Sequence, residues 1–298
     1  MSESVLIFAN PIAGHGLGRA VANRIAQRLA RDRFTPKVIF KRPDLLADHE
    51  IDGAARAAIA IGGDGTVRGV ARRLHVAFGG AMPPVLVVPM GTANLLGQHL
   101  GTRWRDRELP GKVSAAVQGR RTLQLDAASA NGELFLLMAG IGLDARVVHE
   151  LDRIRSGPID ITDYALPAAL ALGFYRYPAL TITVNGRQLC RDLPSVAFVG
   201  NVKEYGTGFP ILPHAVANDG LLDVCVLPCA NRADALRHLL HAAAGEHLAS
   251  EGTIYTKGKQ IQITSAEAVP VQIDGEAAGH TPLEIDLLPA RVPFIVPG

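Results

Sequence analysis

The sequence has little excess charge and few aromatic residues. Its formal net charge is +2 at pH 7, and phenylalanine, tyrosine and tryptophan together make up 5% of it. No stretch interleaves basic with aromatic residues. A protein that binds nucleic acid through its overall charge carries a much larger basic excess. The composition therefore argues against nucleic acid as a partner.

Cysteine is also scarce. The three cysteines, Cys190, Cys225 and Cys229, are an odd number and form no disulfide framework. No second pair of ligands at zinc spacing accompanies Cys225 and Cys229, and the ten histidines show no metal-ligand spacing. We expect buried thiols rather than a zinc site.

Long apolar runs are missing as well. No stretch approaches the roughly 18 apolar residues of a membrane-spanning helix. The start, Met1 to Val5, lacks the basic and apolar regions of a signal peptide. The most apolar candidate, Tyr164–Phe174, contains Pro167 and is expected to be a core segment, with a helix bordering a lipid site as the alternative. These features predict a cytoplasmic protein with transient membrane association.

The chain is nevertheless long and apolar enough for two domains, with 298 residues of which 48% are hydrophobic. Up to about residue 121, strand-like and helix-like segments alternate, as in an α/β layer. Beyond that point most segments are strand-like, Asn131-Gly132 and Asn185-Gly186 are hairpin signals, and Arg232–His247 is helical in pattern. We predict a Rossmann-like α/β domain with a parallel sheet over residues 1–122, and a mainly antiparallel β-sandwich over residues 123–298.

Three strand-like segments in the first domain each end in a glycine-containing loop that leads into helical sequence. These loops are Asn10–Gly18, Gly62-Gly63-Asp64-Gly65-Thr66 and Pro89–Asn94. The carboxyl ends of parallel strands share one edge of a sheet, so the loops are expected to form one rim. Glycines and the helix start that follows suit a phosphate group. The Gly-Lys-Ser/Thr ending of a P-loop is absent, and so is the Gly-x-Gly-x-x-Gly spacing of a dinucleotide-binding loop.

These loops, read as Asn-Pro-x-x-Gly, Gly-Gly-Asp-Gly-Thr and Pro-x-Gly-Thr-x-Asn, resemble the diacylglycerol kinase catalytic family, which includes bacterial lipid kinases and sphingosine kinases. Three later segments extend the resemblance over nearly the whole chain: Ala139–Ala145, Asn218–Asp223 and Gln272–Glu276. The resemblance implies two domains with the active site in the cleft between them. It also implies magnesium-dependent transfer of the γ-phosphoryl group of ATP to a hydroxyl of a diacylglycerol-like or sphingoid lipid.

The residues expected to bind the nucleotide lie in the three loops. They are Gly62, Gly63, Gly65, Thr66, Val67 and Arg68 in the second loop and the helix after it, Asn10 and Gly14 in the first, and Gly91, Thr92 and Asn94 in the third. Phosphoryl transfer depends mainly on positioning and on charge neutralisation. Asp64 and Asp126 are the candidates to hold the magnesium ion, largely through water.

The acidic pair near the end of the chain is the candidate for general-base catalysis. A hydroxyl acceptor needs a carboxylate that takes its proton, and the resemblance places this base in Asp274-Gly275-Glu276. We expect Glu276 to act, with Asp274 as the alternative; surface acids in a β-turn are the non-catalytic interpretation.

The resemblance assigns two further aspartates. A structural magnesium ion would be held by Asp219 with the carbonyl oxygens of Val216 and Leu221. Asp144 would lie near the acceptor head group, or else be a buried aspartate satisfied by the fold.

Two departures from the family pattern keep other functions open. Arg68 replaces a polar family residue and is expected to contact phosphate or solvent, and Leu95 stands where many members have an aspartate that helps to hold the metal. An NAD kinase-like enzyme is the second enzymatic hypothesis, which the third loop and the Asp219–Asp223 segment disfavour. A nucleotide- or lipid-binding sensor without turnover is the third hypothesis.

The expected partner is a lipid substrate at the membrane surface, reached by peripheral, reversible contact. A homodimer is one of the states the sequence allows.

Overall fold

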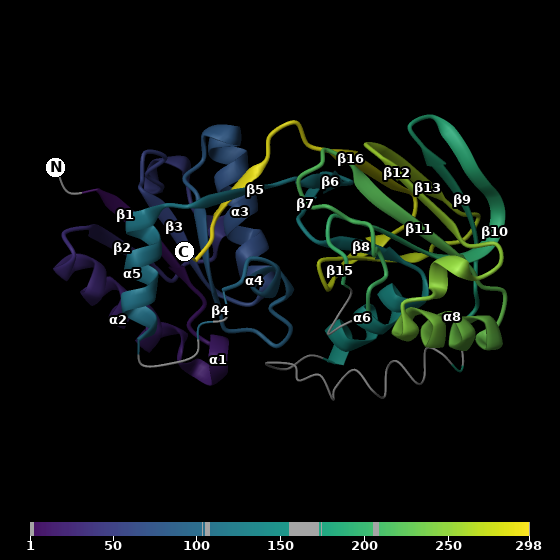
Figure 1. The fold of residues 1–298 in the computed structure, drawn as a ribbon, viewed down its shortest axis with the longest axis horizontal. Coiled ribbons are helices and arrows are strands. Elements are labelled where there is room, and N and C mark those ends of the chain that lie inside the picture. The colour runs from purple at the N-terminus through teal and green to yellow at the C-terminus, as the bar shows by residue number, and fades with distance from the viewer. Residues whose placement is uncertain are drawn as a thin grey trace. The chain divides into compact units, whose positions relative to one another are not determined.

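The computed structural model describes residues 3–102, 104, 108–154, 173, 175–204 and 209–297. The chain forms two compact units. Unit 1 comprises Met1–Leu125 and Ala290–Gly298, and unit 2 comprises Asp126–Pro289 (Figure 1). Apart from Gly173, the predicted apolar segment Tyr164–Phe174 lies outside the described residues.

Unit 1 is built on a mixed sheet with the strand order β2-β1-β3-β4-β17-β5. Neighbours run parallel from β2 to β17, and β5 is antiparallel to β17. The strands β1, β3 and β4 are nearly continuous apolar runs, as expected when helices cover both faces of a sheet. The predicted α/β domain is therefore confirmed. The strand bounds are β1 Ser4–Ala9, β2 Thr35–Ile39, β3 Ala57–Gly62, β4 Val85–Pro89, β5 Thr122–Leu125 and β17 Val292–Ile295.

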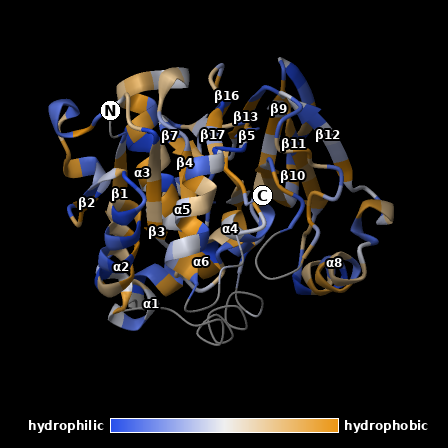
Figure 2. Cartoon of the chain, turned by 60° about the vertical axis from the view of Figure 1, so that its left-hand side comes forward, coloured by the Kyte–Doolittle hydropathy of each residue, from blue (hydrophilic) through white to orange (hydrophobic). Residues whose placement is uncertain are grey.

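Helices cover this sheet because each presents one apolar stripe. The helix α2 (Gly18–Arg31) buries Ala22, Ile25 and Leu29 in the same core as α5 (Leu109–Gly119), and Figure 2 shows hydrophilic and hydrophobic segments alternating along α2. The helix α3 (Asp64–Phe78) contacts β3 and β4. Two short helices, α1 (Ala13–Gly16) and α4 (Leu95–His99), follow β1 and β4.

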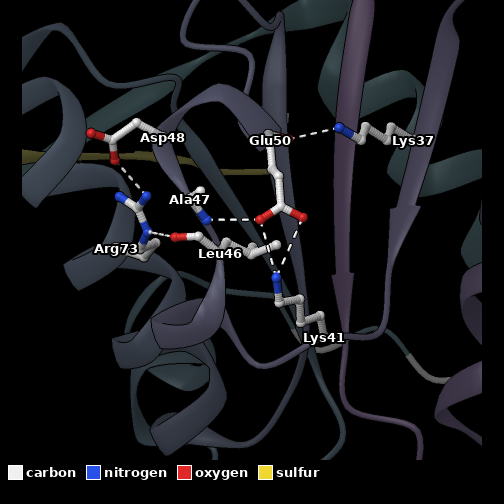
Figure 3. A network of polar contacts seen from close by, with 7 residues as sticks. All are labelled: Lys37, Lys41, Leu46, Ala47, Asp48, Glu50 and Arg73. Atoms are coloured by element: carbon white, nitrogen blue, oxygen red, sulfur yellow. Dashed lines mark hydrogen bonds and ion pairs between the residues drawn. The ribbon is translucent and has the colours of Figure 1, made fainter.

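The connection between β2 and β3 is fastened to α3 by a polar network (Figure 3). The Glu50 carboxylate accepts hydrogen bonds from the Ala47 N–H at 2.8 Å and from Lys41 Nζ at 3.1 Å. On the α3 side, Arg73 Nε donates to the Leu46 carbonyl oxygen at 2.9 Å. The short 3₁₀ helices Pro43–Leu45, Asp48–Glu50 and Gly79–Ala81 lie before and after α3. The network thus anchors the middle of the helix whose first turn carries Asp64.

Unit 2 is an antiparallel β-sandwich, as predicted. The long strand β10 pairs with β9 through its first half and with β8 and β11 through its second half, so it belongs to both layers. Side chains of both layers share one core that includes Ile182, Ile263, Val199 and Val224. The strand bounds are β6 Ala128–Ala130, β7 Glu133–Phe135, β8 Met138–Ile141, β9 Ala179–Val184, β10 Arg187–Gly200, β11 Leu222–Pro228, β12 Ile254–Gly258, β13 Gln260–Thr264, β14 Pro270–Ile273, β15 Glu276–His280 and β16 Leu283–Leu287.

The two hairpin turns and one helix of unit 2 form where the sequence predicts them. Asn131-Gly132 and Asn185-Gly186 have positive φ at both positions and close the β6–β7 and β9–β10 hairpins. The predicted helix is α8 (Arg232–Ala244), followed by the 3₁₀ turn His247–Ala249. The helix α6 (Leu143–Ile154) was not predicted.

The cysteines are free thiols, and burial raises the pKa of Cys225 and of Cys229 to about 12.

The division of the chain differs from the prediction at two places. The first crossing between the units lies after Leu125 rather than after residue 122. The residues from Ala290 onward belong to unit 1 rather than to the sandwich, because β17 pairs with β4 and with β5. Within the described ranges, no helix combines the length and the hydropathy needed to cross a membrane.

Candidate active site

The three glycine-containing loops of unit 1 meet at the carboxyl ends of β1, β3 and β4. The Asn10 N–H donates to the Ile61 carbonyl oxygen at 3.0 Å, and the Gly14 N–H donates to the Met90 carbonyl oxygen at 3.1 Å. The Met90 N–H donates in turn to the Gly62 carbonyl oxygen at 2.8 Å. These backbone contacts form the expected rim, since β1, β3 and β4 are neighbours in the sheet.

Glycine is required where the second and third loops touch. A Cβ atom on Gly91 in the third loop would lie 2.5 Å from Gly63 Cα in the second. Within the second loop, a Cβ atom on Gly62 would lie 2.4 Å from Thr66 Oγ1. Gly63 is the N-cap residue of α3, and no side chain caps this helix end. The first turn of α3, which contains Gly65 and Thr66, therefore offers uncapped backbone N–H groups to an anion.

The Asp64 carboxylate links the second loop to the third. Its two oxygens accept hydrogen bonds from the backbone N–H groups of Leu95 at 3.0 Å and Leu96 at 3.1 Å, at the start of α4. Burial raises the pKa of Asp64, and the N–H groups of Leu96 and Leu95 oppose this rise. The N–H groups of Asn94 and of Asp64 itself also hydrogen-bond to this carboxylate, so the backbone fixes its position.

Other predicted nucleotide ligands have roles inside the loops. Asn94 has a left-handed backbone with φ 50°, and its side chain bonds to both the N–H (2.7 Å) and the carbonyl oxygen (2.5 Å) of Gly91. Asn10 Oδ1 accepts from the Ile12 N–H at 3.1 Å. Val67 is buried, and its N–H donates to the Gly63 carbonyl oxygen at 3.1 Å, so its side chain and N–H are both used within the fold. Arg68 is half-buried on α3.

In unit 2 the two acids considered for the base have different surroundings. Asp274 lies in the β14–β15 turn with φ 50°. Its carboxylate accepts hydrogen bonds from three successive backbone N–H groups, those of Leu136, Leu137 and Met138, at 3.0, 2.9 and 3.0 Å. Glu276 is the first residue of β15 and is half-buried. Asp274 thus holds the backbone ahead of β8, whereas Glu276 retains contact with solvent.

A buried glutamine that the sequence analysis missed supports this turn. Gln272 is fully buried on β14, and its Oε1 accepts from the Gly275 N–H at 2.8 Å. Its Nε2 donates to Asp144 Oδ2 at 3.3 Å. A Cβ atom on Gly140 would lie 1.8 Å from that same Asp144 oxygen, so glycine is needed there. The signal in the sequence was a polar residue inside an apolar strand, two positions before Asp274 in the acidic turn.

A lysine on β12 that the sequence analysis also missed, Lys257, contacts the predicted structural metal loop. Asp219 Oδ1 accepts from the Leu221 N–H at 3.0 Å, and Asp219 Oδ2 accepts from Lys257 Nζ at 2.8 Å. The Val216 carbonyl oxygen accepts from the Asp219 N–H at 3.3 Å. Asp126, which is buried, accepts from the Gly220 N–H at 2.6 Å. Among the described residues, no three or more histidine, cysteine, aspartate or glutamate side chains are arranged to hold a metal ion.

Comparison with known proteins identifies both parts of the chain. The model of the diacylglycerol kinase catalytic domain matches residues 4–129, and that of the YegS C-terminal NAD kinase beta sandwich-like domain matches residues 138–296. A diacylglycerol kinase of Bacillus subtilis is 28% identical over 240 residues, which cover 80% of this chain and 77% of that protein. A Pectobacterium atrosepticum protein named "Probable lipid kinase YegS-like" is 28% identical over 236 residues, or 78% of this chain and 76% of that protein.

A solved structure agrees in fold. The crystal structure of a diacylglycerol kinase from Bacillus anthracis has a TM-score of 0.72 and 24% sequence identity, and the match covers 99% of this chain and 97% of that chain. The six sequence motifs, the α/β and β-sandwich architecture and the two matched domains agree with one another. The chain therefore belongs to the diacylglycerol kinase family and is a lipid kinase, a phosphotransferase.

Proposed function

We propose that this lipid kinase transfers the γ-phosphoryl group of ATP to a hydroxyl of a diacylglycerol-like or sphingoid lipid. The observation that carries the proposal is the meeting of three glycine-containing loops at the edge of the unit 1 sheet, beside an uncapped helix start. Such a rim suits the phosphates of a nucleotide, because backbone N–H groups and the helix dipole both favour negative charge. The curated relatives named as diacylglycerol kinases support a lipid as the acceptor.

Unit 1 provides the proposed nucleotide site. The first turn of α3, with Gly65 and Thr66, would bind phosphate oxygens, and Gly14 and Thr92 would complete the rim. The Asp64 carboxylate, held in place by backbone N–H groups, would contact the water molecules of a hydrated magnesium ion, which keeps several waters and would neutralise phosphate charge. Asp126, the second magnesium ligand predicted from the sequence, belongs to unit 2, where its carboxylate accepts from the Gly220 N–H.

Unit 2 provides the proposed base. Glu276 would accept the proton of the lipid hydroxyl as the oxygen attacks phosphorus, because a half-buried carboxylate can reach a substrate and take a proton. Asp274 is less suited, since three backbone N–H groups already occupy its oxygens. Gln272 would position Glu276 indirectly by holding the Gly275 N–H.

The lipid substrate resides in a membrane, and we propose that the enzyme reaches it by peripheral, reversible contact from the cytoplasm. A net charge of +2 gives only modest attraction to an anionic surface. This proposal combines a membrane-bound substrate with an enzyme that is released after turnover.

A phosphorylation assay tests the proposed function. The purified protein is incubated with magnesium and γ-labelled ATP, and with a diacylglycerol, sphingosine or NAD, and the products are separated by thin-layer chromatography. Labelled lipid is the expected product, and Asp64→Asn, which keeps the size of the side chain and removes its charge, should abolish it. Labelled NAD in place of lipid, or ATP binding without any product, would overturn the proposal.

A further inference from the structure

Lys257 is directed at three oxygen atoms that come from three positions in the chain. Its Nζ donates to the His214 carbonyl oxygen at 3.0 Å and to Asp219 Oδ2 at 2.8 Å, and it lies 3.2 Å from Asp223 Oδ2. An ammonium group has three protons and no acceptor, so three oxygens satisfy it. Lys257 on β12 is the cross-strand partner of Asp223 on β11, which fixes where its side chain starts.

The two carboxylates at this point need a positive partner. Asp223 is fully buried, and its Oδ1 accepts from the Tyr255 hydroxyl at 2.6 Å. A buried carboxylate is strongly disfavoured without an opposite charge. Asp219, in the loop that precedes β11, adds a second negative charge. Lys257 contacts both carboxylates and so provides this charge from within the chain.

The oxygens that the family resemblance assigns to a structural magnesium ion do not fit one here. Asp219 Oδ2 accepts from the Lys257 ammonium group, which lies where a cation bound to this oxygen would lie, and Oδ1 accepts from the Leu221 N–H. The Val216 carbonyl oxygen accepts the Asp219 N–H. A magnesium ion demands near-octahedral oxygen coordination at about 2.1 Å, and a cation so close to the Lys257 ammonium group would be repelled by it.

We infer that the Lys257 ammonium group takes the place of a divalent cation and holds the His214–Asp223 loop without any metal. The loop is fastened at one side by Lys257 and at the other by the bond from the Gly220 N–H to Asp126. In this chain the stability of unit 2 depends on a side chain rather than on the supply of divalent ions. The inference concerns the fold and does not depend on the reaction that the enzyme catalyses.

Thermal unfolding of the full chain tests this inference. The variants are Lys257→Met, which removes the charge and keeps an unbranched side chain, and Lys259→Met, which removes the neighbouring exposed lysine as a matched control. Each protein is unfolded in EDTA and, separately, in magnesium or calcium chloride, without nucleotide. We expect Lys259→Met to unfold like the wild type in every medium, with the same rise in Tm from any magnesium bound at Asp64, and Tm of Lys257→Met to be lower by on the order of 5 °C or more in each medium.

Two outcomes would overturn the inference. One is a fall in Tm of the wild type in EDTA as large as that caused by Lys257→Met. The other is a Lys257→Met protein that unfolds like the wild type. If Lys257→Met does not fold, the metal content of the dialysed Asp64→Asn protein tests the inference instead. That variant lacks the proposed catalytic metal ligand, so any metal that it retains would be bound at another site. We expect no stoichiometric magnesium or calcium in it, and one bound equivalent would contradict the inference.

Discussion

At the scale of single residues, the three backbone N–H groups around Asp274 separate its role from that of Glu276. A carboxylate that accepts three such bonds is committed to the backbone it organises. Two acids that are equivalent by their spacing in the sequence therefore become distinct in the fold. The difference leads to opposite expectations for their isosteric amide variants.

Glu276→Gln should act on the reaction and leave the fold unchanged. The variant keeps the shape of the side chain and removes its ability to take a proton. General-base catalysis typically contributes about 10²–10⁴-fold, so the maximal rate should fall within that range. Steady-state kinetics with a saturating lipid measures the rate, and nucleotide titration should give an unchanged affinity. A variant that retains most of its activity would remove Glu276 from the role of base.

Asp274→Asn should act on stability. An amide has one acceptor oxygen, so its NH₂ group would face a backbone N–H, such as that of Leu136, which loses its partner. Leaving a buried donor unsatisfied costs about 1–3 kcal/mol, and the free energy of unfolding should fall by this amount. Urea unfolding of the variant beside Glu276→Gln makes the comparison. A stable Asp274→Asn protein without activity would show instead that Asp274 is the base.

At the scale of helices and strands, α8 is held to the sandwich by a histidine. His238 is buried, and its Nε2 donates to the Pro228 carbonyl oxygen at 2.7 Å. Within the described residues its Nδ1 is buried without a hydrogen-bond partner. Burial lowers the pKa of His238, and the bond to the Pro228 carbonyl oxygen raises it. The charge of Arg237 lowers the pKa further, and the charge of Asp234 raises it.

Mild acid should therefore weaken the docking of α8. Because the pKa of His238 is lower in the folded protein, the unfolded chain binds the proton more readily. The stability from neutral His238 is complete above the unfolded pKa of about 6.5 and is lost as the pH falls toward the folded pKa. We expect Tm to fall less between pH 7.5 and 5.5 in His238→Gln, which keeps a donor for Pro228, than in the wild type. Parallel pH profiles of the two proteins would contradict this assignment.

The elements that the sequence predicts well are those with local signals. The apolar runs of β1, β3 and β4, their glycine loops and the two Asn-Gly hairpins are all encoded within a few residues. The contacts of Asp274 and Lys257 are not, because they depend on which strands pair and in what register. Asp223 faces Lys257 only because β11 lies beside β12.

At the scale of the whole molecule, the low net charge limits the strength of the proposed contact with a membrane. A basic residue near an anionic surface contributes about 1 kcal/mol, so a chain of net charge +2 should bind anionic vesicles weakly. Raising the salt concentration should release much of the bound protein. Flotation with anionic and with neutral vesicles at low and high salt measures both effects. Tight binding that resists salt would contradict the proposal of peripheral, reversible contact.

The position of β17 also has a consequence for how the protein is made. Until β17 is synthesised, the strand β4 has an open edge and β5 lacks the neighbour with which it pairs. All of Asp126–Pro289 leaves the ribosome before that strand does. The sandwich is a continuous stretch of chain and can close first, although domains made earlier usually fold earlier. The nascent unit 1 therefore has an exposed sheet edge until then, the kind of surface that chaperones protect from aggregation.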